Sequence, residues 1–299
     1  MKIPITFLGT SQAIPTARRN HTAILLQYDN ENILIDCGEG TQRQFRKARL
    51  NPCKITRLLI THWHGDHILG IAGLFQTLLL NGYNKTLHVY GPRGTKHNLN
   101  ALLDLLVPYN KIPLVVTEVE NGKFLETKDF FIESIPLKHS IPAVAFSFVE
   151  KERIRIKKDK LKKYKIPNSP IIGEIQKGKD IVLNGKKIKA SELTYKSEQK
   201  KITIILDTKI NNNCYEIAEC SDLLITEAVY LNNEKDLADL HEHLTAEQAG
   251  DIAKKSKSKK LILAHLSQRY DCNEKAVLAE AKKKFKNVFI AEDLMSVVV

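Results

Sequence analysis

Cysteine is scarce in this 299-residue chain, and its spacing is irregular. The number of cysteines is odd and no two have the C-x-x-C spacing; they are Cys37, Cys53, Cys214, Cys220 and Cys272. A zinc ribbon and a thioredoxin motif are therefore excluded. Buried free thiols in a reducing compartment are the expected state.

Long apolar runs are also lacking. No segment approaches the ~20 consecutive apolar residues that a membrane-spanning helix needs. The first residues, Met1 to Gly9, have no basic segment followed by an apolar run of signal-peptide length. We therefore expect a cytoplasmic protein that has no membrane partner.

Acidic residues are the minority among the charged ones. There are 34 Asp and Glu against 46 Lys and Arg, which gives a net charge of +12. Nine basic and two acidic residues lie between Lys151 and Lys165, so this segment alone supplies +7 of the total. A run of lysines can be no more than a solvated loop, but this concentration of charge favours binding of a polyanion.

Short apolar runs alternate with longer helical patterns along the chain. Strands are expected at residues 3–8, 23–28, 32–36, 58–61, 87–90, 115–119, 130–135, 143–149, 202–206, 222–226, 260–264 and 288–291, and helices at 68–80, 96–106, 245–255 and 274–285. Consecutive strands with interspersed helices predict a mixed system of sheets with helices on the outside.

The basic segment predicts an inserted arm. From Lys151 to Lys189 the sequence has too little apolar surface for a separate domain. Residues 181–183 and 186–188 flank Asn184-Gly185, a pair typical of a tight hairpin turn. We expect a projecting arm that is part of the surrounding fold.

A dense group of metal-binding residue types follows the apolar run 57–60. Within six residues the chain places His62, His64, Asp66 and His67. A lone histidine is usually an ordinary surface or core residue, whereas three histidines and an aspartate this close together are typical of a metal site. Imidazole nitrogen and carboxylate oxygen suit zinc, and also manganese or iron.

Three more residues of these types follow apolar runs in the same way. They are His139, Asp207 and His265. Side chains at like ends of neighbouring strands can converge at one edge of a sheet. Taken singly, each could also be an ordinary loop or turn residue.

The motif His62, His64, Asp66, His67 has the form H-x-H-x-D-H, the hallmark of the metallo-β-lactamase superfamily, which the sequence resembles. Within it, the chain is similar to the tRNase Z family of endonucleases, which remove 3′ trailers from precursor tRNA. The similarity lies in five further segments: 15–20, 36–44, 227–228, 243–245 and 267–270.

This resemblance implies a fold and a pair of metal ions. The fold would be α/β, a four-layer αβ/βα sandwich over residues 1–299 with the basic arm, 151–189, as a tRNA-binding exosite. Two ions per subunit are implied, zinc with Mn²⁺ or Fe²⁺ as alternatives. Their ligands would be His62, His64 and His139 for one ion, Asp66, His67 and His265 for the other, and Asp207 for both.

The resemblance also implies catalytic roles. Two such ions activate a water that attacks the phosphorus. Asp66 would accept a proton from that water, and His243, held by Glu227, would protonate the leaving oxygen. The alternative for His243 is a polar loop before a helix that Thr245 caps, with Gln248 at the capping-box position. Asp36 is expected to orient metal ligands without binding the metal.

The expected partners are precursor tRNA and a second copy of the chain, whose arm would serve the neighbouring active site. Residues expected to contact RNA are Arg19, Asn20 and Arg269 near the cut, and Lys151, Arg153, Arg155, Lys157 and Lys158 on the arm.

Other functions are compatible with parts of the sequence. A superfamily hydrolase of a small ester or phosphodiester would explain the metal motif but not the basic arm. A non-catalytic RNA-binding protein would not need the complete ligand set, and a redox protein would need a flavin or iron–sulfur motif that the sequence lacks.

Overall fold

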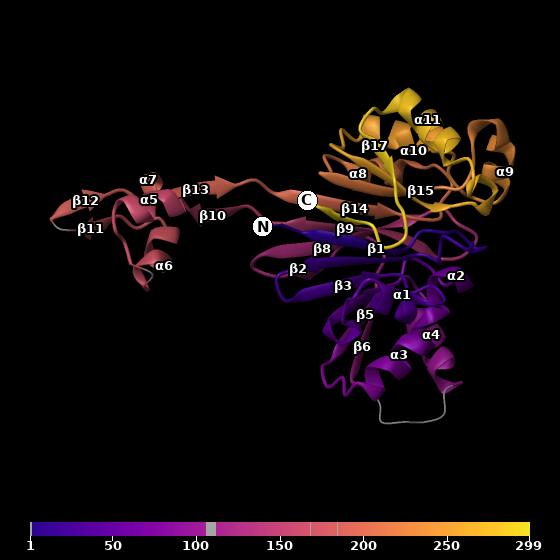
Figure 1. The fold of residues 1–299 in the computed structure, drawn as a ribbon, viewed down its shortest axis with the longest axis horizontal. Coiled ribbons are helices and arrows are strands. Elements are labelled where there is room, and N and C mark those ends of the chain that lie inside the picture. The colour runs from indigo at the N-terminus through magenta and orange to yellow at the C-terminus, as the bar shows by residue number, and fades with distance from the viewer. Residues whose placement is uncertain (1, 106–111, 168, 184) are drawn as a thin grey trace. The chain divides into compact units, whose positions relative to one another are not determined.

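The structure, a computed structural model, describes residues 2–105, 112–167, 169–183 and 185–299 (Figure 1). The chain divides into two compact units. The first consists of Met1–Leu125, Ile132–Phe148 and Lys201–Val299, and the second of Glu126–Phe131 and Val149–Lys200.

One sheet of the first unit has seven strands among the described residues. Their order is β18 (Ser296–Val298), β1 (Pro4–Gly9), β2 (Ala23–Tyr28), β3 (Glu31–Ile35), β4 (Arg57–Leu59), β5 (Leu87–Gly91) and β6 (Leu114–Glu118). Pairing is antiparallel from β18 to β3 and parallel from β3 to β6.

The other sheet also has seven strands in the described ranges. Their order is β17 (Val288–Ile290), β16 (Leu261–Leu266), β15 (Leu223–Ala228), β14 (Lys200–Ile205), β9 (Ala143–Glu150), β8 (Phe130–Leu137) and β7 (Gly122–Glu126). The pairs from β14 to β17 are parallel.

The two sheets pack face to face through aromatic side chains. The ring centroids of Tyr28 on β2 and Phe148 on β9 are 5.1 Å apart, and those of Tyr90 on β5 and Phe124 on β7 are 4.9 Å apart. These contacts bury the inner faces of both sheets and exclude water from between them.

Helices cover both outer faces, as Figure 1 shows. Leu74 and Phe75 share a buried cluster with Leu58 of the first sheet, and Ile252 shares one with Leu224 of the second. The four-layer αβ/βα sandwich is thereby confirmed. The helices are α1 (Thr41–Lys47), α2 (Gly65–Ile68), α3 (Gly70–Leu80) and α4 (Thr95–Asp104) in the first half, and α8 (Asn212–Ala218), α9 (Lys235–Leu240), α10 (Ala246–Lys255) and α11 (Glu274–Lys284) in the second, with short 3₁₀ turns at Pro52–Lys54, Asn232–Glu234 and Gln268–Tyr270.

The second unit contains the predicted basic arm. It pairs β10 (Arg153–Ile156) with β13 (Thr194–Ser197) and β11 (Ile181–Leu183) with β12 (Lys186–Ile188), both antiparallel, beside α5 (Lys158–Lys163), α6 (Ile171–Gln176) and α7 (Ala190–Leu193). The hairpin at 181–188 is confirmed, while Asn184 of its turn lies outside the described residues. A small apolar cluster that includes Ile175 and Leu193 is buried here.

Most predicted elements are present, with shifted ends. The helix predicted at 68–80 begins earlier and is divided, so that Asp66 and His67 lie on α2. Leu106, the predicted end of α4, lies outside the described residues. The helix α1 and the edge strand β18 were not predicted. Within the described ranges, every helix is too short or too polar to span a lipid bilayer.

Candidate metal centre

The seven predicted metal ligands meet at one edge of the sandwich. His62 and His64 lie in the loop after β4, and Asp66 and His67 follow on α2. The others come from the end of a strand or just after it in the second sheet: His139 after β8, Asp207 after β14 and His265 near the end of β16. The chain thus brings both sheets to one site.

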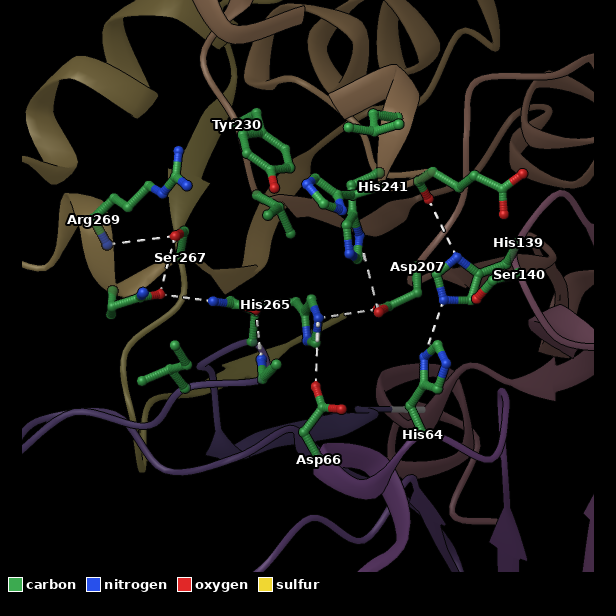
Figure 2. A pocket seen from close by; sticks show the side chains of 18 of the residues that line it. His64, Asp66, His139, Ser140, Asp207, Tyr230, His241, His265, Ser267 and Arg269 are labelled. Carbon is green, nitrogen blue, oxygen red and sulfur yellow. Dashed lines mark hydrogen bonds and ion pairs between the residues drawn. The ribbon is translucent and has the colours of Figure 1, made fainter. Parts of the chain in front are cut away.

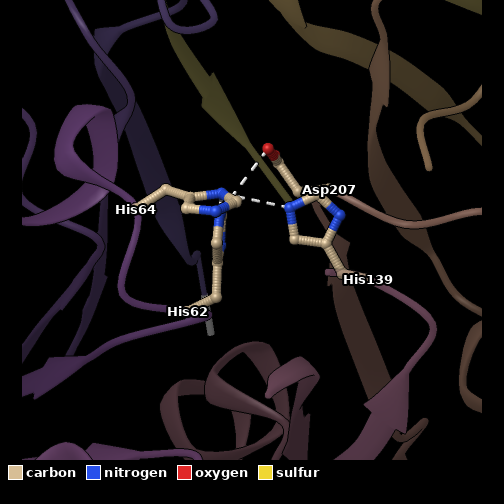
Figure 3. Close-up of side chains that lie close together, drawn as sticks. All are labelled: His62, His64, His139 and Asp207. Atoms are coloured by element: carbon tan, nitrogen blue, oxygen red, sulfur yellow. Dashed lines mark hydrogen bonds and ion pairs between the residues drawn. The ribbon is translucent and has the colours of Figure 1, made fainter. Parts of the chain in front are cut away.

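Three imidazole nitrogens and a carboxylate oxygen form one group of donors (Figure 3). His64 Nδ1 lies 3.1 Å from both His62 Nε2 and His139 Nε2. Asp207 Oδ2 lies 3.6 Å from His62 Nε2. Nitrogen and oxygen atoms that converge in this way can hold one divalent cation.

A second group shares Asp207 with the first. The other carboxylate oxygen, Oδ1, lies 3.1 Å from His265 Nε2 and 3.4 Å from His67 Nε2. Asp66 Oδ2 lies 3.3 Å from His67 Nε2. One oxygen of Asp207 therefore faces each group, an arrangement that suits a bridging ligand.

The glycine-rich turn after β3 holds His67 through the ring nitrogen that faces away from the donor groups. Asp36 Oδ2 is 2.7 Å from His67 Nδ1, and the Asp36 carboxylate also accepts hydrogen bonds from the backbone and hydroxyl of Thr61. A Cβ at Gly38 would lie 2.4 Å from the Asp66 carbonyl oxygen, so only glycine permits this close approach. Since a carboxylate only accepts, His67 donates from Nδ1 to Asp36, and Nε2 is the ring atom that faces the site.

Two more histidines are oriented in the same way. His265 Nδ1 is 2.7 Å from Thr22 Oγ1, whose own proton is donated to the Ser11 carbonyl. His139 Nδ1 is 3.3 Å from the Glu242 carbonyl oxygen. Both imidazoles must therefore donate from Nδ1, which turns Nε2 toward the other ligands.

Two buried atoms of the site are left without a hydrogen-bond partner among the described residues. They are His67 Nε2 and Asp207 Oδ1. Buried polar atoms are almost always paired, so such atoms in the middle of a donor cluster fit a bound cation. The residues present therefore fit a divalent metal.

The electrostatics of the site also favour a cation. Burial opposes charge on His67, but Asp207, Asp36 and Asp66 together raise the pKa of this imidazole well above its ordinary value. Burial would likewise raise the pKa of Asp207, yet His265 and the neighbouring imidazoles hold it well below its usual range. Carboxylates that stabilise a proton on His67 can equally stabilise a metal ion in its place.

Four residues around the site have left-handed backbone. Asp36, Asp207, Glu242 and His265 have φ angles of 56°, 32°, 56° and 53°, although none is glycine. Each such conformation costs about 1–3 kcal/mol and persists only where the surrounding structure enforces it. Here it turns Asp207 and His265 inward and aims the Glu242 carbonyl at His139.

His243 lies beside the two groups of donors. Its Nδ1 is 3.0 Å from Glu227 Oε2 and 3.9 Å from Asp207 Oδ2, while Glu227 Oε1 accepts a hydrogen bond from the Thr208 backbone. Although burial opposes it, the Glu227 carboxylate raises the pKa of His243 to about 9. The imidazolium can therefore keep a proton at neutral pH.

The helix that follows His243 is capped as the alternative interpretation proposed. Thr245 Oγ1 accepts from the Gln248 backbone, and the Gln248 side chain accepts from the Thr245 backbone. The capping box and the His243–Glu227 pair occur together, because the cap holds the end of the loop that carries His243.

A pocket of about 980 Å³ opens onto these residues (Figure 2). His64, Asp66, His139, Asp207 and His265 form its floor. Its other walls include His243 and the side chains of Gln12, Ile14, Ser140, Tyr230, Asp239, Leu240, His241, Glu242, Ser267, Gln268 and Arg269.

The residues predicted to contact RNA near the cut lie in different environments. Arg269 lines the pocket, and its side chain is 47% exposed. Asn20 is half-buried and donates to the Glu39 carbonyl. Arg19 is only 4% exposed, and its guanidinium binds Glu274, Thr10 and the Ala291 carbonyl. This burial argues against the RNA contact predicted for Arg19 and assigns it to the packing of its loop.

The arm residues predicted to contact RNA also differ among themselves. Lys151 pairs with Glu126, Arg153 with Asp129 and Arg155 with Glu150. Lys157 precedes α5, and Lys158 is exposed in its first turn. Neither has an ion pair within the described residues, so the uncompensated charge lies at α5.

Sequence reasoning missed Thr22, Tyr230 and His241. Thr22 meets His265 across 243 positions of sequence, and no local pattern reveals that contact. Tyr230 and His241 line the pocket, but each is a single residue in an ordinary segment. His241 adjoins His243 in His241-Glu242-His243, which was the one available indication.

Ribonuclease Z proteins align with nearly the whole chain. Ribonuclease Z of Nanoarchaeum equitans is 37% identical over 290 residues, which cover 97% of this chain and 91% of that protein. Ribonuclease Z of Methanothermobacter thermautotrophicus is 36% identical, with 98% and 95% covered. The chain belongs to the ribonuclease Z family.

Solved structures share this fold over nearly the whole chain. The short form of human tRNase Z has a TM-score of 0.72 at 27% identity and covers 98% of both chains. The metallo-β-lactamase fold protein YhfI of Bacillus subtilis has a TM-score of 0.73 at 18% identity, covers 100% of this chain and 99% of its own, and shows the shared fold. The family model of the anti-Pycsar protein Apyc1 matches residues 3–166, which include His62 to His67 but neither Asp207 nor His265.

The hydrogen bond from Thr22 to His265 should control metal affinity. In Thr22→Val the hydroxyl that fixes the His265 tautomer is lost, and metal affinity should fall by about 10- to 100-fold. Metal content after dialysis against a graded chelator measures this. Thr6→Val, a similar change at a buried β1 position away from the site, should keep wild-type affinity. Equal affinity in Thr22→Val and wild type would contradict the assignment.

Proposed function

We propose that this protein is a metal-dependent endoribonuclease that removes the 3′ trailer from precursor tRNA. Cleavage would leave a 3′-hydroxyl on the tRNA and a 5′-phosphate on the trailer. The full-length relationship to ribonuclease Z supports the reaction. The observation that carries it is the complete set of seven donor residues beside the His243–Glu227 pair.

The metal ligands of this proposal are the two donor groups described above. His62, His64 and His139 would hold one ion, Asp66, His67 and His265 the other, and Asp207 would serve both. We propose two zinc ions per subunit, because imidazole nitrogens and carboxylate oxygens suit zinc, with Mn²⁺ or Fe²⁺ as alternatives. When bound, a pair of such ions supplies Lewis acidity, which makes water nucleophilic near neutral pH and stabilises charge on phosphate.

The protein's own groups move the protons. Asp66 lines the pocket floor and can accept a proton from the attacking water. His243 holds its Nδ1 against Glu227, so Nε2 is the atom left to protonate the leaving 3′ oxygen of the ribose. Glu227 is fully buried and bound to the Thr208 backbone, which fixes the orientation of the pair.

The second unit supplies the charge that a large RNA requires. Its residues, 126–131 and 149–200, include 17 Lys and Arg against nine Asp and Glu, a net charge of +8. We propose that the arm, 151–189, is an exosite for the tRNA body, which is read mainly by shape and backbone charge. A homodimer whose arms serve each other's active sites, and a cytoplasmic location, belong to this proposal as predictions from the family.

Cleavage of a precursor tRNA that carries a 3′ trailer tests the proposed reaction. The zinc-loaded wild type should release a trailer with a 5′-phosphate and a tRNA with a 3′-hydroxyl, mapped to the nucleotide. His64→Ala, which removes a ligand, should lower the rate by at least about a thousandfold. If the metal-loaded wild type leaves the precursor intact but hydrolyses a small ester, the alternative hydrolase function replaces this one.

The role of His243 can be separated from metal binding by the choice of leaving group. His243→Ala should slow precursor cleavage by about 10²- to 10⁴-fold, the usual contribution of a general acid. A nitrophenyl phosphodiester has a leaving group that needs no proton, so its hydrolysis should fall far less. Metal content serves as the control. Equal losses on both substrates would show that His243 is not the proton donor.

The arm should act on binding and not on chemistry. Replacement of three exposed lysines of α5, Lys158, Lys162 and Lys163, by glutamine should weaken precursor binding and flatten its dependence on salt. Hydrolysis of a small phosphodiester should be spared, as it should in a deletion of residues 151–189. A matched control is the triple glutamine variant at Lys282, Lys283 and Lys286, which lie in the first unit. Equal weakening in both triple variants, or loss of both activities, would contradict an exosite at α5.

A further inference from the structure

One pocket wall carries an aromatic side chain that the proposed chemistry does not use. His241 follows the last turn of α9, where its backbone N–H donates to the Leu237 carbonyl at 2.9 Å. Its side chain is exposed and lines the pocket. Within the described residues the ring has no hydrogen bond or ion pair. The backbone of His241 is therefore held by the helix end, while its imidazole is accessible from the pocket.

The ring of His241 lies parallel to a buried tyrosine. The interplanar angle with Tyr230 is 12° and the centroids are 6.3 Å apart. Arg269 packs on Tyr230 as well, with its guanidinium carbon 5.6 Å from the ring centroid. In Figure 2 Tyr230 lies between Arg269 and His241. Flat groups thus follow one another along this wall.

Arg269 is held in place and its charge is compensated. Its Nη1 is 2.7 Å from Glu234 Oε1, and Glu234 also binds the Tyr270 hydroxyl. Asp239 and Glu242 line the same pocket beside His241. Asp239 is paired with Lys209, and Glu234 neutralises Arg269, the one Lys or Arg among the described lining residues. The wall therefore has no excess positive charge to attract a phosphate, whereas a neutral aromatic ring can stack on it.

The position of this wall relative to His243 identifies the ligand. Tyr230 lies 6.2 Å from the His243 ring, and His241 is two residues away on the same loop. If His243 protonates the leaving oxygen, the nucleotide that carries this oxygen must lie on the same side of the pocket. That nucleotide is the last one of the tRNA product.

We propose that His241, supported by Tyr230 and Arg269, forms a stacking site for the nucleobase immediately 5′ of the cut. This rests on the proposed function. The exposed face of His241 receives the base, Tyr230 sets the tilt of the imidazole, and Arg269 closes the wall. Stacking accepts any base, so the site positions the last nucleotide and aligns its 3′ oxygen with His243 without selecting a sequence.

A comparison of intact and abasic substrates tests this site. The wild type, His241→Ala and His241→Phe are assayed on a precursor tRNA with a base or no base at the nucleotide 5′ of the cut. On the intact substrate His241→Ala should lower kcat/KM by about tenfold or more, which is the usual effect of removing an aromatic partner of one base. His241→Phe, which keeps a flat ring, should recover most of this loss. On the abasic substrate the three proteins should differ by less than about twofold.

The outcomes separate this inference from the proposed function. An equal loss in His241→Ala on both substrates, or a phenylalanine variant as slow as the alanine variant, overturns the stacking site while leaving the nuclease assignment intact. Failure of the metal-loaded wild type to cut either precursor overturns both.

Discussion

The shared carboxylate of Asp207 is the contact on which the site depends. It is almost fully buried, and its two oxygens face different groups of imidazoles. A buried carboxylate costs several kcal/mol unless positive charge or hydrogen bonds compensate it, so this one requires its neighbours in place. Those neighbours come from both sheets. The Asp207 charge is therefore compensated only when the two halves of the sandwich are packed together, and this packing also assembles the site.

Three of the five imidazoles are positioned in the same way. In each, the ring nitrogen that faces away from the donor groups meets an oxygen atom: Asp36 for His67, Thr22 for His265 and the Glu242 carbonyl for His139. Several of these positions have left-handed backbone, a conformation that is unfavourable in free energy. A rigid two-sheet core can sustain such strain, whereas an isolated loop could not.

The sequence predicted the layers well, and it singled out residues that do converge, because the apolar runs and the first four of these residues are local features. The strand Ala23–Tyr28 is apolar except for Gln27, and H-x-H-x-D-H is a contiguous motif. Prediction failed where the partner is distant. Arg19 reads as an exposed loop residue, yet it is buried against Glu274, 255 positions away. His265 reads as the residue after a strand, but β16 continues to Leu266, where its register with β15 shifts. The roles of the ligands and of the arm remain predictions.

The two ends of the described chain meet, since β18 pairs with β1 at Pro4 and Val298. Next to this seam, Asp293 accepts hydrogen bonds from Thr10 and from the Asn20 backbone and so ties down the segment that leads to Thr22. Thr10 and Asp293 are 283 positions apart. When the ribosome has completed the first strands, Asp293 is therefore still far from being synthesised. The segment around Thr10 and Asn20 gains this anchor, and the site its final form, only after Asp293 has been translated.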